Sequence, residues 1–136
     1  MSRVLVLMGS ESDLPTMQEG VDVLAENGVE TEVVVSSAHR DPARTAELAA
    51  GAAAAGFGVV ICGAGLSAAL PGVVAAHTRL PVIGVPISAG TLGGLDALLS
   101  IVQMPPGVPV ATVGIDSARN AAHLALRILG RSAPAV

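Results

Sequence analysis

Short aliphatic runs alternate with longer amphipathic stretches along this chain of 136 residues. The aliphatic runs predict five strands, at residues 3–8, 29–35, 57–62, 81–85 and 108–115. The stretches that follow them predict five helices, at residues 15–27, 42–55, 70–78, 94–102 and 117–129. Most strands are apolar at every position, which is typical of strands covered on both faces. Strict alternation predicts a single α/β domain over residues 1–136, with a parallel five-stranded sheet between two layers of helices.

Helix-start and helix-stop residues support these boundaries. Asp13 and Asp41 each stand just before a first-turn proline, so each is expected to cap a helix. Gly28 and Gly56 follow the first two helices, where a residue that tolerates the left-handed conformation is expected. Parallel sheets bind ligands beyond the carboxyl ends of their strands. That rule selects four loops for inspection, at residues 9–14, 36–41, 63–69 and 86–93.

The first of these loops reads Gly9-Ser10-Glu11-Ser12-Asp13 and leads directly into a helix. Gly9 permits a tight turn, and the backbone amides and hydroxyls after it form a natural anion site at a helix N-terminus. Asp13 offers an acceptor for sugar hydroxyls. The alternative is that Ser12 or Asp13 only caps the helix. The pattern is not the glycine-rich motif of dinucleotide-binding proteins.

The second loop contains the only pair of adjacent residues suited to proton transfer and anion binding, His39 and Arg40. An imidazole titrates near physiological pH, so it can donate and accept a proton. A guanidinium offers a planar fork that suits phosphate. Although a lone loop histidine is usually a surface residue, this pair lies at the binding edge of the predicted sheet, which favours a functional role.

Small residues dominate the third and fourth loops. The third, residues 63–72, would let a flat ligand approach the backbone, or would serve tight packing of a helix on the sheet. The fourth, residues 86–94, fits either a lid that contacts the ligand or a plain connector.

Composition excludes several classes of function. All seven basic residues are arginine, which removes lysine Schiff-base chemistry, covalent pyridoxal phosphate and a Walker-type phosphate site. A net charge of −4 without a basic cluster argues against nucleic-acid binding. Cys62 ends an apolar run and is expected to be a buried core residue. No signal peptide or membrane span is expected, so we predict a cytoplasmic protein without a membrane partner.

The chain is also apolar for its size. Its residues are 51% hydrophobic and 13% charged. Apolar surface beyond what one small core can hide usually enters a subunit interface, so we expect a homo-oligomer. The alternative is an alanine-rich composition, since alanine is apolar yet sits harmlessly on helix surfaces.

With these loops in view, the chain resembles the PurE family of purine biosynthesis from about residue 4 to residue 129. The strongest stretches are residues 8–13, 37–40, 84–86, 98–105 and 107–113. Two activities occur in this family, N5-carboxyaminoimidazole ribonucleotide mutase and aminoimidazole ribonucleotide carboxylase. The resemblance implies a flavodoxin-like three-layer sandwich, assembly as an octamer, a ribonucleotide substrate together with CO2, and no metal or organic cofactor.

The resemblance also implies roles for individual residues. His39 would be the general acid and base, Arg40 would bind the phosphate, and Ser10, Ser12 and Asp13 would contact the ribose phosphate. In the family's chemistry CO2 is lost from the amine and then captured by the ring carbon, which needs a dry pocket. The expected substrate-binding residues are Gly9, Ser10, Ser12, Asp13, Ser37, Ala38, Arg40, Gly63, Ala64, Gly65, Ser67, Ala69 and Leu70.

The third loop departs from the family pattern. The mutase branch carries Ala-His-Leu-Pro-Gly where this chain has alanine at position 69, and the arginine-containing signature of the CO2-using branch is absent as well. Leu66 and Ser67 replace smaller residues. The chain also ends soon after the last predicted helix, where many mutases continue, so its subunit packing could differ.

We therefore expect carboxyl transfer on aminoimidazole ribonucleotide in the mutase direction. The alternative activity is direct carboxylation or decarboxylation of this or a related heterocyclic nucleotide, in primary or specialised metabolism. Two alternatives from other classes are a flavin-binding carrier and a non-catalytic subunit. The first is disfavoured because the chain has no Trp or Tyr and one Phe.

Overall fold

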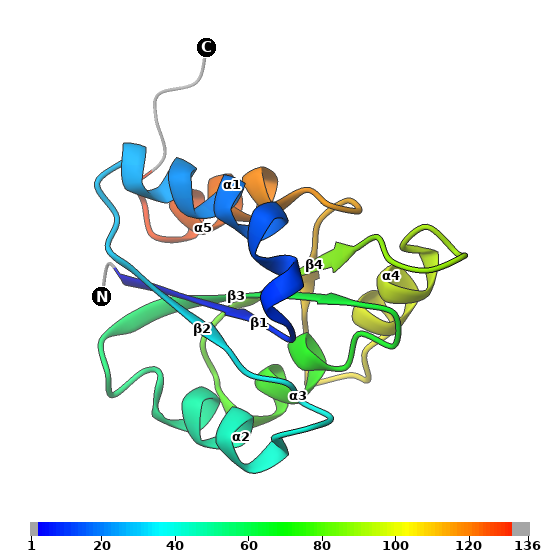
Figure 1. Ribbon diagram of the computed structural model, residues 1–136. Coiled ribbons are helices and arrows are strands. Elements are labelled where there is room, and N and C mark those ends of the chain that lie inside the picture. Colours follow the sequence, from blue (N-terminus) through cyan, green and yellow to red (C-terminus); the bar gives the residue numbers. More distant parts are fainter. Residues whose placement is uncertain (1–2, 132–136) are drawn as a thin grey trace.

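A computed structural model describes residues 3–131 and shows an α/β sandwich (Figure 1). The strands are β1 (Arg3–Met8), β2 (Thr31–Val35), β3 (Phe57–Gly65), β4 (Val82–Ile87) and β5 (Ala111–Thr112). The helices are the short 3-10 turn η1 (Glu11–Asp13), then α1 (Leu14–Glu26), α2 (Pro42–Gly51), α3 (Leu70–His77), α4 (Leu95–Val102) and α5 (Ala118–Ile128). Among these described residues, no helix is long and apolar enough to cross a bilayer.

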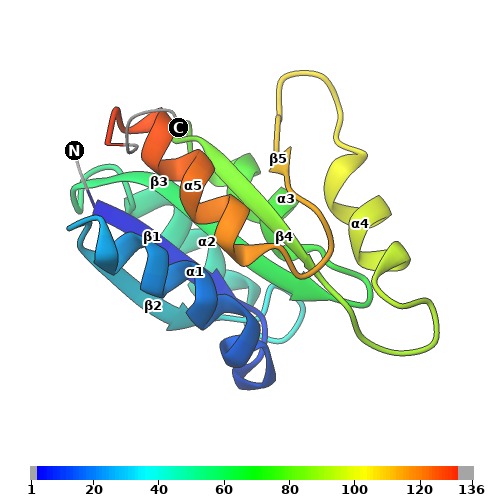
Figure 2. The ribbon, with the colours of Figure 1, turned by 90° about the horizontal axis from the view of Figure 1, so that it is seen from above.

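The five strands form one parallel sheet in the order β2-β1-β3-β4-β5, which confirms the predicted class and is the order of the flavodoxin-like fold. Helices α1 and α5 lie side by side on one face (Figure 2), and α2 and α3 cover the other (Figure 1). The chain leaves β1 towards β2 and then returns to β3 on the opposite side. This reversal opens a crevice at the carboxyl ends of β1 and β3, where ligands of such sheets bind.

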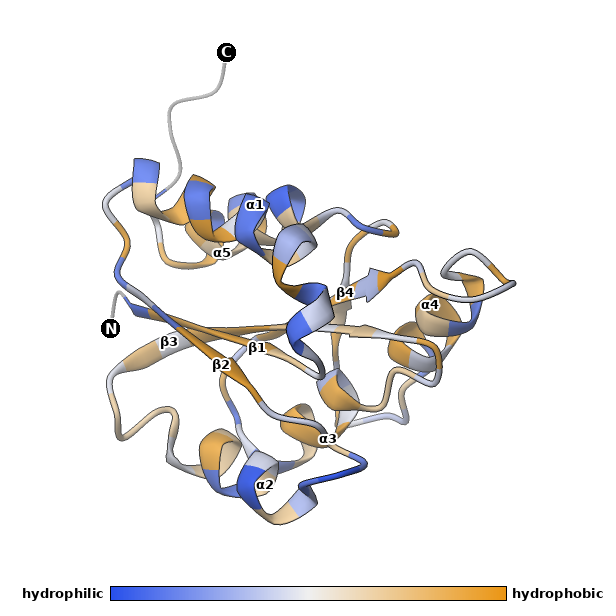
Figure 3. Ribbon diagram, viewed as in Figure 1, coloured by the Kyte–Doolittle hydropathy of each residue, from blue (hydrophilic) through white to orange (hydrophobic). Residues whose placement is uncertain are grey.

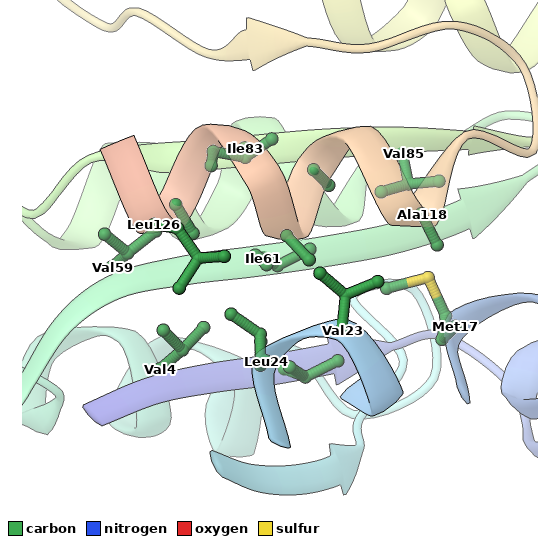
Figure 4. Packing of buried hydrophobic residues seen from close by; sticks show 14 of the residues in the cluster. Val4, Met17, Val23, Leu24, Val59, Ile61, Ile83, Val85, Ala118 and Leu126 are labelled. Atoms are coloured by element: carbon green, nitrogen blue, oxygen red, sulfur yellow. The ribbon is translucent and has the colours of Figure 1, made fainter. Parts of the chain in front are cut away.

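Alternation along β1 divides the core between the two faces. Val4, Val6 and Met8 pack under α1 and α5, whereas Leu5 and Leu7 point to the face covered by α2 and α3. Figure 4 shows the first of these clusters, and Figure 3 shows the apolar strands at the centre with polar positions on the outer sides of the helices. Since all of these side chains are at most 2% exposed, the central strands form a rigid platform for the loops at their ends.

Strand boundaries differ from the predictions for reasons of pairing. The strand predicted at 57–62 continues to residue 65, because β3 lies between β1 and β4 and finds partners for its last three residues. The strand predicted at 108–115 keeps two residues, since edge strand β5 pairs only with β4. β2 begins at Thr31, β4 runs from Val82 to Ile87, and α2 ends at Gly51, followed by turns.

Candidate functional site

A cavity of about 470 Å³ opens at the carboxyl edge of the sheet, above the ends of β1 and β3. Its lining comprises Gly9, Ser10, Ser12, Asp13, Ser37, Ala38, His39, Arg40, Ala64, Gly65, Leu66, Ser67, Ala69, Leu70 and Ala89. The structure thus brings together, from three separate loops, every predicted site residue except Gly63.

The first loop is shaped by η1, a turn that the sequence reading did not foresee. The Gly9 backbone N–H donates to the Gly63 carbonyl at 3.3 Å, which ties the loop to β3. The Ser10 hydroxyl caps η1 by accepting from the Ser12 N–H at 3.3 Å, and the two hydroxyls lie 2.9 Å apart. Both hydroxyls are therefore held as a pair at the cavity wall.

Asp13 stands at the N-cap position of α1, but its side chain makes no capping hydrogen bond, contrary to the prediction. Its backbone, at the end of η1, is in a helical conformation. Asp13 instead lines the cavity, half-buried. Burial raises the pKa of the Asp13 carboxyl, and a hydrogen bond with the Ser10 backbone lowers it in part. A ligand that donates hydrogen bonds to this partly desolvated carboxylate would stabilise its ionised form.

The second loop is a turn anchored from below by a buried hydroxyl pair that the sequence reading missed. The Ser36 and Thr45 hydroxyls lie 2.7 Å apart, and both residues are almost completely buried. Thr45 also donates to the Asp41 carbonyl at 3.1 Å, and Asp41 caps α2 by accepting from the Arg44 N–H at 3.4 Å, as predicted. No signal in the sequence distinguishes this serine and threonine from surface hydroxyls, because their contact depends on the packing of α2 against β2.

The turn presents His39 and Arg40 at the mouth of the cavity. The Ser37 hydroxyl accepts from the Arg40 N–H at 3.1 Å, so the backbone conformation of the pair is set locally. Both side chains are exposed. Among residues 3–131, neither the imidazole nor the guanidinium forms a hydrogen bond or salt bridge, which leaves both groups available to a ligand.

The third loop combines tight packing with an opening onto the cavity. Gly63, one of the expected substrate-binding residues, is not among the lining residues, because its Cα faces Met17 in the core, where a side chain would collide with that sulfur. Gly65 lies at the cavity, where a Cβ would come within 3.2 Å of the Ile87 carbonyl. Small residues here therefore allow tight packing on one side of β3 and an open cavity on the other.

Two apolar lining residues were missing from the predicted set. Leu66 has a positive φ of 52° and a mostly exposed side chain, and Ala89 comes from the loop after β4. With Ala64 and Ala69 they form the apolar part of the cavity wall, which we call its apolar end. The position of Ala89 favours the ligand-contact interpretation of the fourth loop, because a plain connector would not reach the cavity.

A larger cavity, of about 760 Å³, lies at the opposite, amino edge of the sheet between residues 75–81 and 107–109. Its only imidazole, His77, is engaged through Nδ1 with the Val73 carbonyl at 2.9 Å. None of the predicted site residues lies there. The smaller cavity is the better candidate because it combines hydroxyls, a carboxylate, an imidazole and a guanidinium at the edge where parallel sheets bind ligands.

The cavity suits a small anionic substrate better than a flavin. Among the described residues its lining contains no Phe, Tyr or Trp, and the one phenylalanine, Phe57, is buried at the far end of β3. Within residues 3–131, no group of three or more histidine, cysteine or acidic residues is placed to hold a metal ion. The ionisable groups of the wall are Asp13, His39 and Arg40, which can bind hydroxyls, exchange a proton and bind an anion respectively.

Comparison with known proteins gives the family. The family model described as AIR carboxylase matches residues 3–136. The N5-carboxyaminoimidazole ribonucleotide mutase of Pyrococcus abyssi is 57% identical over the whole chain, which spans 78% of that protein. The phosphoribosylaminoimidazole carboxylase of Ogataea methanolica is 55% identical over 95% of this chain, which spans 24% of that longer protein.

Comparison with solved structures points to the same family. The crystal structure of Treponema denticola PurE superimposes with a TM-score of 0.81 and 29% identity, covering 93% of this chain and 79% of that one. The likeness thus extends over sequence, fold and nearly all of the chain's length. This chain belongs to the AIR carboxylase family, the PurE family of purine biosynthesis.

Proposed function

We propose that this chain is an enzyme that converts N5-carboxyaminoimidazole ribonucleotide into 4-carboxyaminoimidazole ribonucleotide. The observation that carries the proposal is the convergence of a hydroxyl pair with a guanidinium and an imidazole, both unpaired among residues 3–131, on one cavity with an apolar end. Curated mutases at 54–58% identity over nearly the whole chain support it. Because the substrate is a charged ribonucleotide that does not cross a bilayer unaided, the proposed compartment is the cytoplasm.

The phosphate and ribose occupy the polar end in this proposal. Ser10 and Ser12 donate hydroxyl hydrogen bonds to phosphate oxygens, and the Arg40 guanidinium adds a charge-assisted pair of donors. Asp13 accepts from the ribose hydroxyls, which offsets the cost of its partial burial. These contacts exist in substrate and product alike, so they set affinity more than the rate of the chemical step.

The aminoimidazole ring then lies towards the apolar end, beside His39. The N–C bond of the carbamate breaks, CO2 is released inside the cavity, and the amine nitrogen gains a proton. The ring carbon C4 attacks the CO2, a C–C bond forms, and C4 loses its proton. His39 moves the proton between these positions as general acid and base. Ala64, Leu66, Ala69 and Ala89 keep the volume around the CO2 free of water.

A paired assay tests the proposal. The purified chain is given either the N5-carboxylated ribonucleotide or aminoimidazole ribonucleotide with bicarbonate, and the ultraviolet absorbance of the C4-carboxylated product is followed. The proposal requires rapid product formation from the first substrate. Its absence from both substrates would show that the reaction is another one.

A direct carboxylase is the second candidate, and position 69 is the observation that favours it. Ala69 lines the ring end of the cavity where the mutase pattern has a histidine. Product from the second substrate mixture alone would establish this alternative. The Ala69→His variant separates the two further: a large gain in mutase rate would mean that the present loop serves another substrate.

We also propose that the chain assembles as a homo-oligomer, in the family's octameric form. An exposed apolar series runs along α4 and the turn before it, with alternating spacings of three and four residues. Its members, each at least 46% exposed, are Leu92, Leu95, Leu99 and Val102. Such a seam is characteristic of helices that pack against a partner helix. Light scattering on Leu95→Asp and Leu99→Asp should show a smaller particle, while Ile128→Asp, an exposed apolar position on α5, should leave the mass unchanged.

A further inference from the structure

Asp116, in the connection between β5 and α5, makes an unusual set of contacts with the end of β4. One carboxylate oxygen accepts from the Ser88 backbone N–H at 2.8 Å, and the other accepts from the Ser88 hydroxyl at 2.5 Å. The Asp116 N–H donates to the Pro86 carbonyl at 2.7 Å. Three hydrogen bonds thus join two segments 28 residues apart, and Figure 2 shows this connection crossing beside the carboxyl end of β4.

The backbone at Asp116 is strained for a residue with a side chain. Its φ of 60° lies in the left-handed region, which costs most residues about 1 kcal/mol and glycine almost nothing. Glycine would therefore suit the backbone better, and what aspartate adds is the carboxylate. That carboxylate is bonded to Ser88, and neither residue lines the cavity.

The segment that Ser88 begins depends on this anchor. Residues 88–94 contain three glycines with positive φ, at positions 90, 93 and 94, and most of the segment is exposed. Ala89 forms part of the cavity wall, and the Cα of Gly90 faces the Leu66 side chain, close enough that a Cβ there would lie 3.0 Å from it. The third and fourth loops therefore meet beside the apolar end of the cavity. A glycine-rich loop holds such a position only if its base is fixed.

We propose that Asp116 is a positioning residue that clamps Ser88, so that Ala89 and Leu66 close the apolar end of the cavity around released CO2. This inference rests on the proposed carboxyl transfer. The carbamate N–C bond breaks as the nitrogen takes a proton from His39, which produces CO2 and the free amine of aminoimidazole ribonucleotide. In a closed cavity C4 captures the CO2, and the C4 proton passes to His39. If the wall opens, CO2 escapes and the reaction ends at aminoimidazole ribonucleotide. The clamp therefore governs how turnover divides between carboxylated product and decarboxylated by-product.

The test measures that division in variants of the full chain. Asp116→Gly keeps the left-handed backbone without strain and removes the carboxylate. Asp116→Asn keeps an acceptor for the Ser88 N–H, and its amide can donate to the Ser88 hydroxyl. Ser117→Ala, at the neighbouring residue in the same turn, is the matched control, since within the described part of the chain its hydroxyl donates a hydrogen bond only to the local Ile115 carbonyl, at 3.4 Å. Each enzyme receives the N5-carboxylated substrate, with spontaneous decarboxylation measured without enzyme and subtracted.

Hydrogen bonds to a charged group are strong enough that their loss should raise the ratio of by-product to product on the order of tenfold in Asp116→Gly. Asp116→Asn should stay within about twofold of the wild type, as should Ser117→Ala. Ser88→Ala should raise the ratio by itself and add nothing in the Asp116→Gly background, because both changes break the same contact.

An unchanged ratio in Asp116→Gly, or an equal rise in Asp116→Asn, would overturn the inference even if melting temperatures fell. A wild-type enzyme that yields no carboxylated product would instead overturn the proposed function beneath it. The two failures are therefore distinguishable in one experiment.

Discussion

Replacing Arg40 by glutamine tests the phosphate end of the site against an internal control. Arg40 lies in the turn before α2 and Arg44 in the first turn of that helix; both are exposed, and either substitution removes one positive charge. Arg40 lines the cavity. Arg44 does not, and its guanidinium donates instead to the Val35 carbonyl at 2.9 Å. The two variants therefore lower the net charge by the same amount, but only Arg40→Gln removes a charge from the cavity wall.

The exposure of Arg40 sets how much substrate affinity its replacement should cost. A charge-assisted hydrogen bond contributes about 1.5–3 kcal/mol when shielded from water. Arg40 is exposed, so the lower end applies, and about 1.5 kcal/mol corresponds to roughly a tenfold rise in KM. Because substrate and transition state carry the same phosphate, kcat should change little. The gap between the two variants should narrow as salt is added, since an exposed pair is screened.

Steady-state kinetics on the N5-carboxylated substrate at low and high ionic strength measure these effects, and thermal melts report on folding. Arg44→Gln should keep the wild-type KM even if the lost Val35 contact lowers its melting temperature. A KM for Arg40→Gln within twofold of the wild type would refute the phosphate assignment, and so would an equal rise in Arg44→Gln.

Three further predictions concern single side chains. His39→Asn should lower kcat by about 10²–10⁴-fold with KM little changed, if the imidazole moves the proton; an unchanged kcat would refute that role. The raised pKa of Asp13 means that its ionised form is disfavoured in the folded state, so wild-type stability from this group falls as pH rises through that pKa. Asp13→Asn should therefore melt at a higher temperature than the wild type near neutral pH, with the difference in melting temperature shrinking in acid, and it should bind substrate more weakly. A difference in melting temperature that does not depend on pH would contradict the raised pKa of Asp13. Burial raises the pKa of the Cys62 thiol, so a thiol-reactive reagent should modify it only after denaturant unfolds the chain, and prompt reaction of the native protein would contradict its burial.

Much of the site was predictable because its position follows from topology. Parallel strands end at one edge, so loops that follow strands in the sequence meet there regardless of the details of packing. His39, Arg40, Ser10 and Ser12 were found in this way, and the cavity contains all of them. The prediction that the Asp13 side chain caps the helix was wrong: Asp13 stands at the N-cap position of α1, but η1 gives its backbone a helical conformation, and its side chain lines the cavity without a capping hydrogen bond.

The sequence by itself determined the elements and their class. Apolar runs that alternate with helical stretches indicate a parallel sheet covered on both faces, and local residues such as Asp41 and Gly28 mark the ends of helices through backbone geometry alone. Such signals depend on neighbours in the chain, so they can be read without a structure.

Only the tertiary structure decided which residues face which way. Gly63 packs on Met17 and leaves the cavity lining, while Ala89 joins that lining from another loop. Ser36 and Thr45 become a buried pair, and Asp116 reaches Ser88 across 28 residues. Each of these outcomes depends on contacts between segments remote in sequence, and the orientation of a side chain across such a contact is set by packing rather than by local propensity.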